Sequence, residues 1–280
     1  MPLKSVLIVD DDPAIHLLLD KILTPDGWQI ESASSGEEGL ARFLAGNYDL
    51  VLTDIVMPGM DGFALLKRIR ELRPHARVIF MTVVNTPGNV LEAIRDQAYS
   101  YLSKPFSAES VMFTLSAALA DEESVGDISV FSARPDWVSM ELRCKLSTAD
   151  RLTQFFRELS SDLTPEDREM ISTAFRELLV NAIEHGGHCD PNQKVNLAYV
   201  RGTRCVVYYI RDPGEGFSLD RLPHAAVSNK PGQPFEHAEI RKSLGIRPGG
   251  FGLLLTRNFA DEVVYNERGN EVMLIKYLTP

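Results

Sequence analysis

Short apolar runs alternate with amphipathic segments through the first 120 residues of the chain. Runs such as SVLIV, DLVLT and RVIFMT have the length of buried strands, and the segments between them, such as IHLLLDKIL and GFALLKRIREL, repeat their apolar residues at helical spacing. Strand and helix patterns alternate in this way five times, with short connections. Because parallel strands need crossover connections, the pattern predicts a five-stranded parallel sheet flanked by helices.

The pattern changes after residue 122. Residues 123–136 lose the periodicity and contain acids, glycine and proline, which is typical of a linker. The remaining chain has strand-like runs at 138–146, 194–201, 204–212 and 271–278, and helix-like stretches at 149–163, 165–186 and 249–263. Residues 217–248 are irregular and contain four prolines, and a loop of that length is usually functional. The sequence therefore predicts an α/β protein with domains at 1–122 and 137–280.

Composition supports two ordinary globular domains. The chain has 280 residues, of which 44% are hydrophobic and 24% charged. No stretch approaches the roughly 18 uninterrupted apolar residues of a spanning helix, and the N-terminus carries charges where a signal peptide has its apolar core. The three cysteines are widely spaced and predict reduced thiols. We expect a cytoplasmic protein without membrane partners.

The charge balance argues against nucleic acid as a partner. The formal net charge is −10, and residues 1–122 hold 17 acids against 10 bases. Proteins that bind nucleic acid neutralise phosphates with clustered lysine and arginine, and no basic helix or stripe is evident here.

Polar residues stand where the apolar runs of the first domain end. Asp10 and Asp11 follow the first run, Asp54 ends the third, Thr82 ends the fourth and Lys104 follows the fifth. The carboxyl ends of parallel strands meet at one edge of a sheet, so we expect these side chains to gather there. Three carboxylates would repel one another without a cation, and oxygen ligands suit Mg²⁺. A carboxylate beside such a cation can accept a phosphoryl group, whose oxygens a hydroxyl and an ammonium would bind.

The segments VLIVDDDP, LTDIVMPGMDG, FMT and YLSKPF, in this order and spacing, resemble the receiver domain of bacterial response regulators over residues 1–122. The resemblance implies a flavodoxin-like doubly wound fold, phosphorylated by a sensor histidine kinase or a phosphotransfer protein. It implies these roles: Asp54 as phosphoacceptor, Asp10 and Asp11 with Asp54 as Mg²⁺ ligands, Thr82 and Lys104 as phosphate contacts, and Tyr101 as an aromatic switch.

Three further segments place polar residues and glycines in the second domain. Glu177, Asn181 and His185 are spaced by four residues, so a regular helix would carry them on one face. Asp212 opens the turn DPGEG after an apolar strand, where a carboxylate can accept a hydrogen bond from an amine and glycines permit close approach. The run GGFG at 249–252 opens a helix, whose free N–H groups suit phosphates.

In this order RELLVNAIEHG, DPGEG and GGFGLLLTRNFADEV resemble the ATP-binding motifs shared by gyrase, histidine kinases and anti-sigma-factor serine kinases, over residues 137–280. The resemblance implies an α/β two-layer sandwich that binds ATP and Mg²⁺. Asn181 would hold Mg²⁺, Glu177 would orient or deprotonate the nucleophile, and Asp212 would bind the adenine amine. The nucleotide would be lined by Gly214, Gly216, Gly250 and Gly252, with residues 217–248 as a lid and Arg247 contacting the phosphates.

Two sequence features indicate which branch of that superfamily the second domain resembles. A histidine kinase needs a phosphoaccepting histidine before its ATPase domain, and residues 121–180 contain none. The segments RELLVNAIEHG and FADEVVY look most like those of anti-sigma-factor serine kinases. We therefore predict an ATP-dependent serine/threonine protein kinase, controlled by Asp54, that forms a homodimer and acts on an anti-sigma-factor antagonist or binds a sigma factor. The alternative is a nucleotide-bound module that sequesters a partner with little phosphotransfer.

Overall fold

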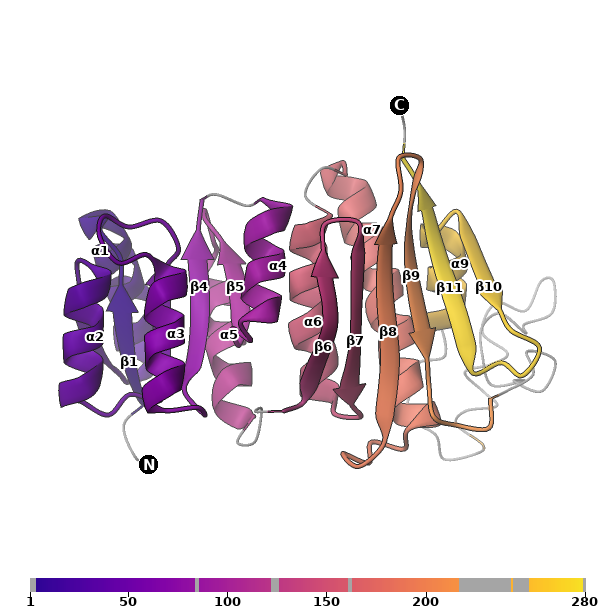
Figure 1. Ribbon diagram of the computed structural model, residues 1–280, viewed down its shortest axis with the longest axis horizontal. Helices are drawn as coiled ribbons and strands as arrows, with labels where there is room; N and C mark the ends of the chain where they lie inside the picture. Colours follow the sequence, from indigo (N-terminus) through magenta and orange to yellow (C-terminus); the bar gives the residue numbers. More distant parts are fainter. Residues whose placement is uncertain are drawn as a thin grey trace. The chain divides into compact units, whose positions relative to one another are not determined.

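The computed structural model describes residues 4–83, 86–121, 126–160, 163–216 and 252–278, together with Ser243 (Figure 1). The chain divides into two compact units, Met1–Asp127 and Ile128–Pro280, and each is described by itself. Within the described ranges, no helix has both the length and the apolar character needed to cross a membrane.

The first unit is a parallel sheet with helices between its strands. The strands run in the order β2-β1-β3-β4-β5 and all neighbours are parallel. This order and the five β–α repeats make a doubly wound fold, as the sequence predicts. Its elements are β1 (Lys4–Val9), α1 (Pro13–Leu23), β2 (Trp28–Ala33), α2 (Gly36–Ala45), β3 (Leu50–Asp54), α3 (Gly62–Leu72), β4 (Arg77–Thr82), α4 (Pro87–Arg95), β5 (Ser100–Ser103) and α5 (Ala108–Ala120), with a 3₁₀ turn at Thr24–Asp26.

The helices of this unit begin where the sequence supplies caps and apolar faces. Asp12, Ser35 and Asp61 each accept a hydrogen bond from a backbone N–H in the first turn of the following helix. Ile79 and Met81 of β4 pack into a buried cluster with residues of α1 and α5. Phe80, between them, faces the other side of the sheet and contacts Phe63 of α3 at a ring-centroid distance of 4.8 Å. Both faces are therefore covered, which explains why the strands read as continuous apolar runs.

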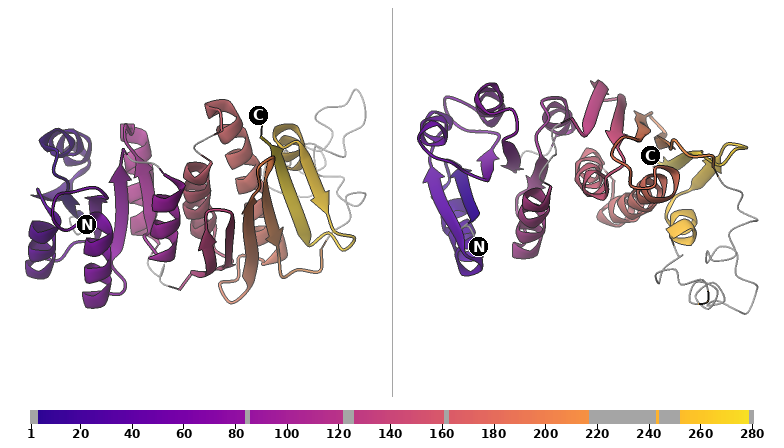
Figure 2. Two further views of the ribbon diagram at one scale, coloured as in Figure 1. Left: turned by 45° about the horizontal axis from the view of Figure 1, so that its top comes forward. Right: turned by 90° about the horizontal axis from the view of Figure 1, so that it is seen from below.

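Among the described residues, the helices of the second unit pack on one face of an antiparallel sheet (Figures 1 and 2). The strand order is β10-β11-β9-β8-β7-β6, and all neighbours are antiparallel. Among the described residues the elements are β6 (Ile128–Arg134), β7 (Trp137–Arg143), α6 (Leu146–Leu159), α7 (Pro165–Asn181), a π-helical turn η2 (Ala182–Gly186), β8 (Lys194–Arg201), β9 (Cys205–Arg211), α9 (Gly252–Phe259), β10 (Glu262–Tyr265) and β11 (Glu271–Tyr277). This two-layer α/β arrangement is the one predicted.

Two strands differ from the sequence-based expectation. β6 occupies residues 128–134, within the range expected to be a linker, and pairs with β7. It is an edge strand with most side chains at least partly exposed, so it lacks a buried apolar run. β10 follows α9 after two residues, and its first two residues lie in the range expected to be helical. Pairing with β7 and β11, which local patterning does not reveal, makes both segments strands.

An aromatic core fixes α7 against this sheet. Phe175 of α7 lies 5.1 Å, between ring centroids, from both Tyr208 of β9 and Phe156 of α6. The Tyr208 hydroxyl and the Ser160 hydroxyl, both buried, share a hydrogen bond of 2.8 Å. Burial of such rings contributes several kcal/mol and their tilted contacts add about 1 kcal/mol each. The helix that carries Glu177 and Asn181 is thus held rigidly.

Candidate functional sites

The ends of β1, β3 and β5 bring together the charged residues of the first unit. The Lys104 Nζ atom lies 2.7 Å from Asp10 Oδ2 and 2.7 Å from Asp54 Oδ2. Asp10 is fully buried and Asp54 nearly so. The other oxygen of Asp54 accepts hydrogen bonds from the backbone N–H groups of Ile55 and Val56. One Asp54 oxygen is therefore fixed by the backbone and the other by an ammonium.

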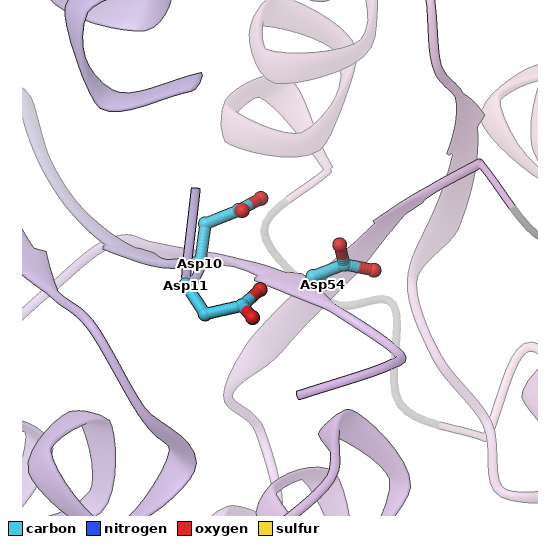
Figure 3. A group of neighbouring side chains, drawn as sticks. All are labelled: Asp10, Asp11 and Asp54. Atoms are coloured by element: carbon cyan, nitrogen blue, oxygen red, sulfur yellow. The ribbon is translucent and has the colours of Figure 1, made fainter. Parts of the chain in front are cut away.

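Asp11 completes an acidic cluster with these two carboxylates (Figure 3). One oxygen each of Asp10, Asp11 and Asp54 lies within 4.8 Å of the others. Asp11 is exposed, which leaves one side of the cluster open to solvent. Three carboxylates and one ammonium leave a formal charge of −2, and an all-oxygen donor set suits a hard divalent cation such as Mg²⁺. Asp12 has a different role, because its side chain caps α1.

Burial and hydrogen bonding shift the pKa values of this cluster. Burial raises the pKa of Asp10 above its ordinary value, and the hydrogen bond from Lys104 only partly offsets that. Burial lowers the pKa of Lys104, but the hydrogen bonds to Asp10 and Asp54 outweigh it, so the pKa is raised overall. Lys104 is therefore a permanent cation between the two carboxylates.

Thr82 and Tyr101 are both fully buried, Thr82 at the end of β4 and Tyr101 in β5. The backbone N–H of Lys104 donates to the carbonyl oxygen of Thr82 at 2.8 Å. The structure thus brings Asp10, Asp11, Asp54 and Lys104 together, with Thr82 bound to Lys104 through the backbone.

In the second unit, α7 carries Glu177 and Asn181 one turn apart, both partly buried. His185 does not continue this face as the regular helical period predicts. It lies in the π-helical turn and is exposed. A π-helical turn has more residues per turn than an α-helix, so residues four apart no longer lie on the same face after Asn181. Such turns are common at functional sites.

The turn after β9 lies against the end of that helix. A Cβ atom added to Gly186 would fall 2.4 Å from the Asp212 side chain, and one added to Gly214 would fall 3.0 Å from the Gly186 Cα. The Asp212 Oδ1 atom accepts a hydrogen bond of 2.8 Å from the Gly214 N–H. Burial raises the pKa of Asp212, and this hydrogen bond opposes the rise. Asp212 is a carboxylate held in a partly buried turn, packed between glycines.

A loop between β10 and β11 fixes the backbone of this turn. The Asp212 N–H donates to the Asn270 carbonyl at 3.0 Å, and the Asn270 side chain donates to the Asp212 carbonyl at 3.4 Å. Gly216 has φ of +83°, and a side chain there would meet the Arg268 carbonyl at 2.0 Å. Glycine is therefore required at 216 by conformation as well as by space.

Several predicted nucleotide contacts cannot be placed. Arg247, Gly250 and the predicted lid at 217–248 lie outside the described residues, apart from Ser243. Gly252 begins α9, which packs beside α7. Gly186 is the residue that sequence reasoning missed. Its position at the end of RELLVNAIEHG is the sequence feature that could have identified it. Its contact with Asp212, however, depends on the π-helical turn.

If Asp212 binds the adenine amine, as the sequence resemblance implies, Asp212→Ala should weaken ATP binding about 5- to 150-fold, because a buried amine without its acceptor costs roughly 1–3 kcal/mol. Gly186→Ala should weaken it by the same mechanism, since the new methyl group displaces the Asp212 carboxylate. Titration calorimetry with ATP measures both changes.

Gly202→Ala is the matched control, because a Cβ there meets only the Cys205 carbonyl at an ordinary 3.5 Å. Unchanged ATP affinity in Asp212→Ala would reject the adenine assignment.

Comparison with known families agrees with this geometry. The model of the response regulator receiver domain matches residues 6–116, and that of the histidine kinase-like ATPase domain matches residues 142–276. The chain therefore belongs to the response regulators, and it carries a histidine kinase-like ATPase domain after its receiver domain.

Individual relatives match mainly through the receiver domain. The transcriptional regulatory protein ResD of Bacillus subtilis is 31% identical over 170 residues, which cover 60% of this chain and 68% of ResD. RprY of Bacteroides fragilis is 34% identical over 41% of this chain and 48% of its own length, so this chain spans about half of that relative. A solved receiver domain protein from Clostridium thermocellum is 31% identical over 43% of this chain and 97% of that chain, with a TM-score of 0.41.

Proposed function

We propose that phosphorylation of Asp54 controls an ATP-dependent serine/threonine protein kinase in the second unit, which acts on an anti-sigma-factor antagonist or a similar partner protein. The kinase assignment rests on one arrangement: Glu177 and Asn181 lie on α7, and Asp212 lies beside the end of that helix. The phosphoryl group on Asp54 would come from a sensor histidine kinase or a phosphotransfer protein.

The geometry around Asp54 supports its role as phosphoacceptor. Its Oδ2 atom is held at the ammonium of Lys104, and its Oδ1 atom at two backbone N–H groups. Asp10, Asp11 and Asp54 would hold Mg²⁺, which supplies charge neutralisation for the incoming phosphoryl oxygens. Lys104 would then bind a phosphoryl oxygen, since its ammonium already reaches the Asp54 carboxylate.

In the second unit Asn181 would hold Mg²⁺ and Glu177 would orient or deprotonate the hydroxyl of the partner's serine or threonine. Both are partly buried on a helix fixed by the aromatic core, so their positions are predefined. Gly214 and Gly216 would line the nucleotide, together with Gly250, Gly252 and Arg247.

Incubation of the full chain with radiolabelled ATP and candidate antagonist proteins tests this function. Acid-stable label on the partner is the expected result, because phosphoserine and phosphothreonine survive acid. Tight, nucleotide-dependent binding of the partner without label would instead support the alternative, a module that sequesters its partner.

Beryllofluoride with Mg²⁺, a stable mimic of an acyl phosphate, should change the kinase rate or the partner affinity of the full chain about 5- to 150-fold. This is the range that coupling free energies of roughly 1–3 kcal/mol allow. An effector can shift a two-state equilibrium only if it binds the two states differently, so beryllofluoride bound at Asp54 must favour one of two states of the chain.

The Asp54→Asn chain should show no response to beryllofluoride. If the kinase rate and partner affinity of the wild-type chain also stayed unchanged while beryllofluoride bound at Asp54, the receiver domain would not control the second unit.

A further inference from the structure

Two of the three cysteines lie close together, beside the turn that carries Asp212. Cys144 directly follows β7 and is fully buried, and Cys189 is exposed in the loop between the π-helical turn and β8. A side chain at Gly187 would meet the Cys144 sulfur at 2.1 Å, so this sulfur lies directly against the Gly187 backbone. Cys189 is only two residues further along the chain. The two thiols are therefore neighbours, one covered by the protein and one open to solvent.

The turn that joins Gly187 to Cys189 holds an unfavourable backbone conformation. The Asp190 N–H donates to the Gly187 carbonyl at 2.9 Å, which closes a four-residue turn. Its two central residues, His188 and Cys189, have φ of +53° and +52°. Residues other than glycine seldom adopt positive φ, and such conformations cluster at functional segments. The contacts around the turn, and not the preferences of its own residues, therefore keep it in place.

Cys144, in contrast, is fixed by the sheet. Every residue of β7, from Trp137 to Arg143, is paired with β8. The Cys144 N–H donates to the Gln193 carbonyl at 3.1 Å, directly before β8 begins. Cys144 thus belongs to the rigid part of the second unit and Cys189 to a loop, so the loop has to move if the two sulfurs are to approach each other.

The backbone between the two cysteines also supports the Asp212 turn. A side chain at Gly186 would fall 2.4 Å from the Asp212 side chain, and the next residue, Gly187, touches the Cys144 sulfur. The Asp212 carboxylate and the Cys144 thiol therefore pack against adjacent residues. A movement of the loop at Cys189 reaches Asp212 through these two glycines.

The two thiols differ in their access to oxidants. Burial is the main cause that raises the pKa of the Cys144 thiol to about 11, and negative charge on Cys189, Asp190 and Asp212 adds to the rise. Because the thiolate is the reactive form of cysteine, Cys144 is protected both by its protonation and by its burial. Cys189 is exposed, so an oxidant in solution meets it first.

We propose that Cys144 and Cys189 are a site of reversible oxidation, where a peroxide converts the two thiols to a disulfide that displaces the Asp212 turn. The disulfide is independent of the proposed kinase function. Its effect on nucleotide binding rests on that function, because it requires Asp212 to contact ATP.

The oxidation uses one molecule of hydrogen peroxide in two steps. The Cys189 thiolate first attacks a peroxide oxygen, so that an S–O bond forms, the O–O bond breaks, and the departing hydroxide takes up a proton to become water. Cys189 is then a sulfenic acid. In the second step the Cys144 thiol gives up its proton and its sulfur attacks the Cys189 sulfur, so that an S–S bond forms, the S–O bond breaks and a second water leaves. Both sulfurs are oxidised and the peroxide is reduced, and a small dithiol reverses the change.

A disulfide requires a new position of the loop. Its two Cβ atoms lie about 3.8 Å apart, so the exposed Cys189 side chain has to turn inward to Cys144, past the Gly187 backbone. The turn then leaves its positive-φ conformation, and Gly186 no longer packs against Asp212. The Asp212 carboxylate loses the support that holds it in place.

Treatment of the full chain with hydrogen peroxide tests the disulfide. The oxidised chain should lose two alkylatable thiols and two hydrogen atoms in mass, and digestion should release a peptide that links Cys144 to Cys189, identified by mass spectrometry. Dithiothreitol should restore both thiols. Cys189→Ser, at an exposed position, should abolish the linked peptide. Cys205→Ser, at the start of β9, is the matched control and should leave it unchanged.

Amide hydrogen exchange tests the displacement in the absence of ATP. On oxidation, residues 212–216 should exchange about 10-fold faster, because the Gly214 N–H loses its hydrogen bond to the Asp212 carboxylate. Residues 206–210, within β9, should exchange at an unchanged rate. ATP affinity, measured by calorimetry, should fall about 5- to 150-fold, the usual range of coupling between two sites. The Cys189→Ser chain should keep its ATP affinity after peroxide treatment.

These measurements separate the disulfide from the proposed function. A linked peptide with faster exchange at 212–216, in a chain that binds ATP in neither state, would contradict the proposed function and support the oxidation site. Absence of the linked peptide, or a disulfide that instead joins two chains on non-reducing electrophoresis, would overturn the proposal. Unchanged exchange at 212–216 in the disulfide form would overturn it as well.

Discussion

Asp54→Asn should abolish labelling of the chain by a small phosphodonor such as acetyl phosphate, while the wild-type chain gains a base-labile phosphate. The substitution replaces the carboxylate that we propose as the nucleophile with an uncharged amide but keeps the shape of the side chain. The amide oxygen can still accept the hydrogen bonds from Ile55 and Val56, and Lys104 keeps its 2.7 Å contact with Asp10, so the fold should be preserved. Labelling should also require Mg²⁺, because the cluster has a formal charge of −2 that must be neutralised.

Asp49→Asn is the matched control for this experiment. Asp49 directly precedes the same strand, and its side chain accepts hydrogen bonds from the partly buried Ser5, at the opposite end of β3 from the acidic cluster. Its loss should leave labelling unchanged. Phosphate that persists on the Asp54→Asn chain would assign the phosphoacceptor elsewhere.

The first unit could be predicted from sequence almost completely, and the reason is physical. In this doubly wound sheet the inner strands β1, β3 and β4 are buried on both faces, and the carboxyl ends of all strands lie at the same edge. Strand ends are therefore visible as the points where apolar runs stop, at Asp10, Asp54 and Thr82. That Asp10 and Asp54 lie beside Lys104 follows from the topology, and the structure confirms it. The simultaneous contact of the Lys104 ammonium with both carboxylates, at 2.7 Å each, is a detail of distance that no sequence pattern contains.

The second unit was less predictable because, in the part of the chain that the structure describes, its helices cover only one face of its sheet. β6 is an edge strand with exposed side chains, so its sequence resembles a linker. The contact of Gly186 with Asp212 depends on the π-helical turn at 182–186, which interrupts the 3.6-residue period on which the alignment of His185 with Glu177 rested. Non-local pairing and a local change in helical geometry are the two features that periodicity cannot reveal.

Glu177→Gln should leave ATP affinity unchanged while reducing phosphotransfer to the partner about 10²- to 10⁴-fold, the range typical for loss of a general base. Glutamine keeps the size of the side chain and its place on α7, which packing of Phe175 against Tyr208 maintains. The adenine contact would be provided by Asp212, on a separate turn, so binding and transfer should respond to different substitutions.

The control is Glu169→Gln on the same helix, whose carboxylate is exposed and pairs with Arg157 at 2.8 Å. It should transfer phosphate at the wild-type rate. Calorimetry and single-turnover transfer from ATP, measured side by side on Glu177→Gln, Asp212→Ala and Glu169→Gln, give three distinct outcomes: loss of transfer alone, loss of binding, and no loss. If Glu177→Gln transferred phosphate normally, the carboxylate would not act on the nucleophile, and a phosphotransfer role for α7 would have to come from another residue.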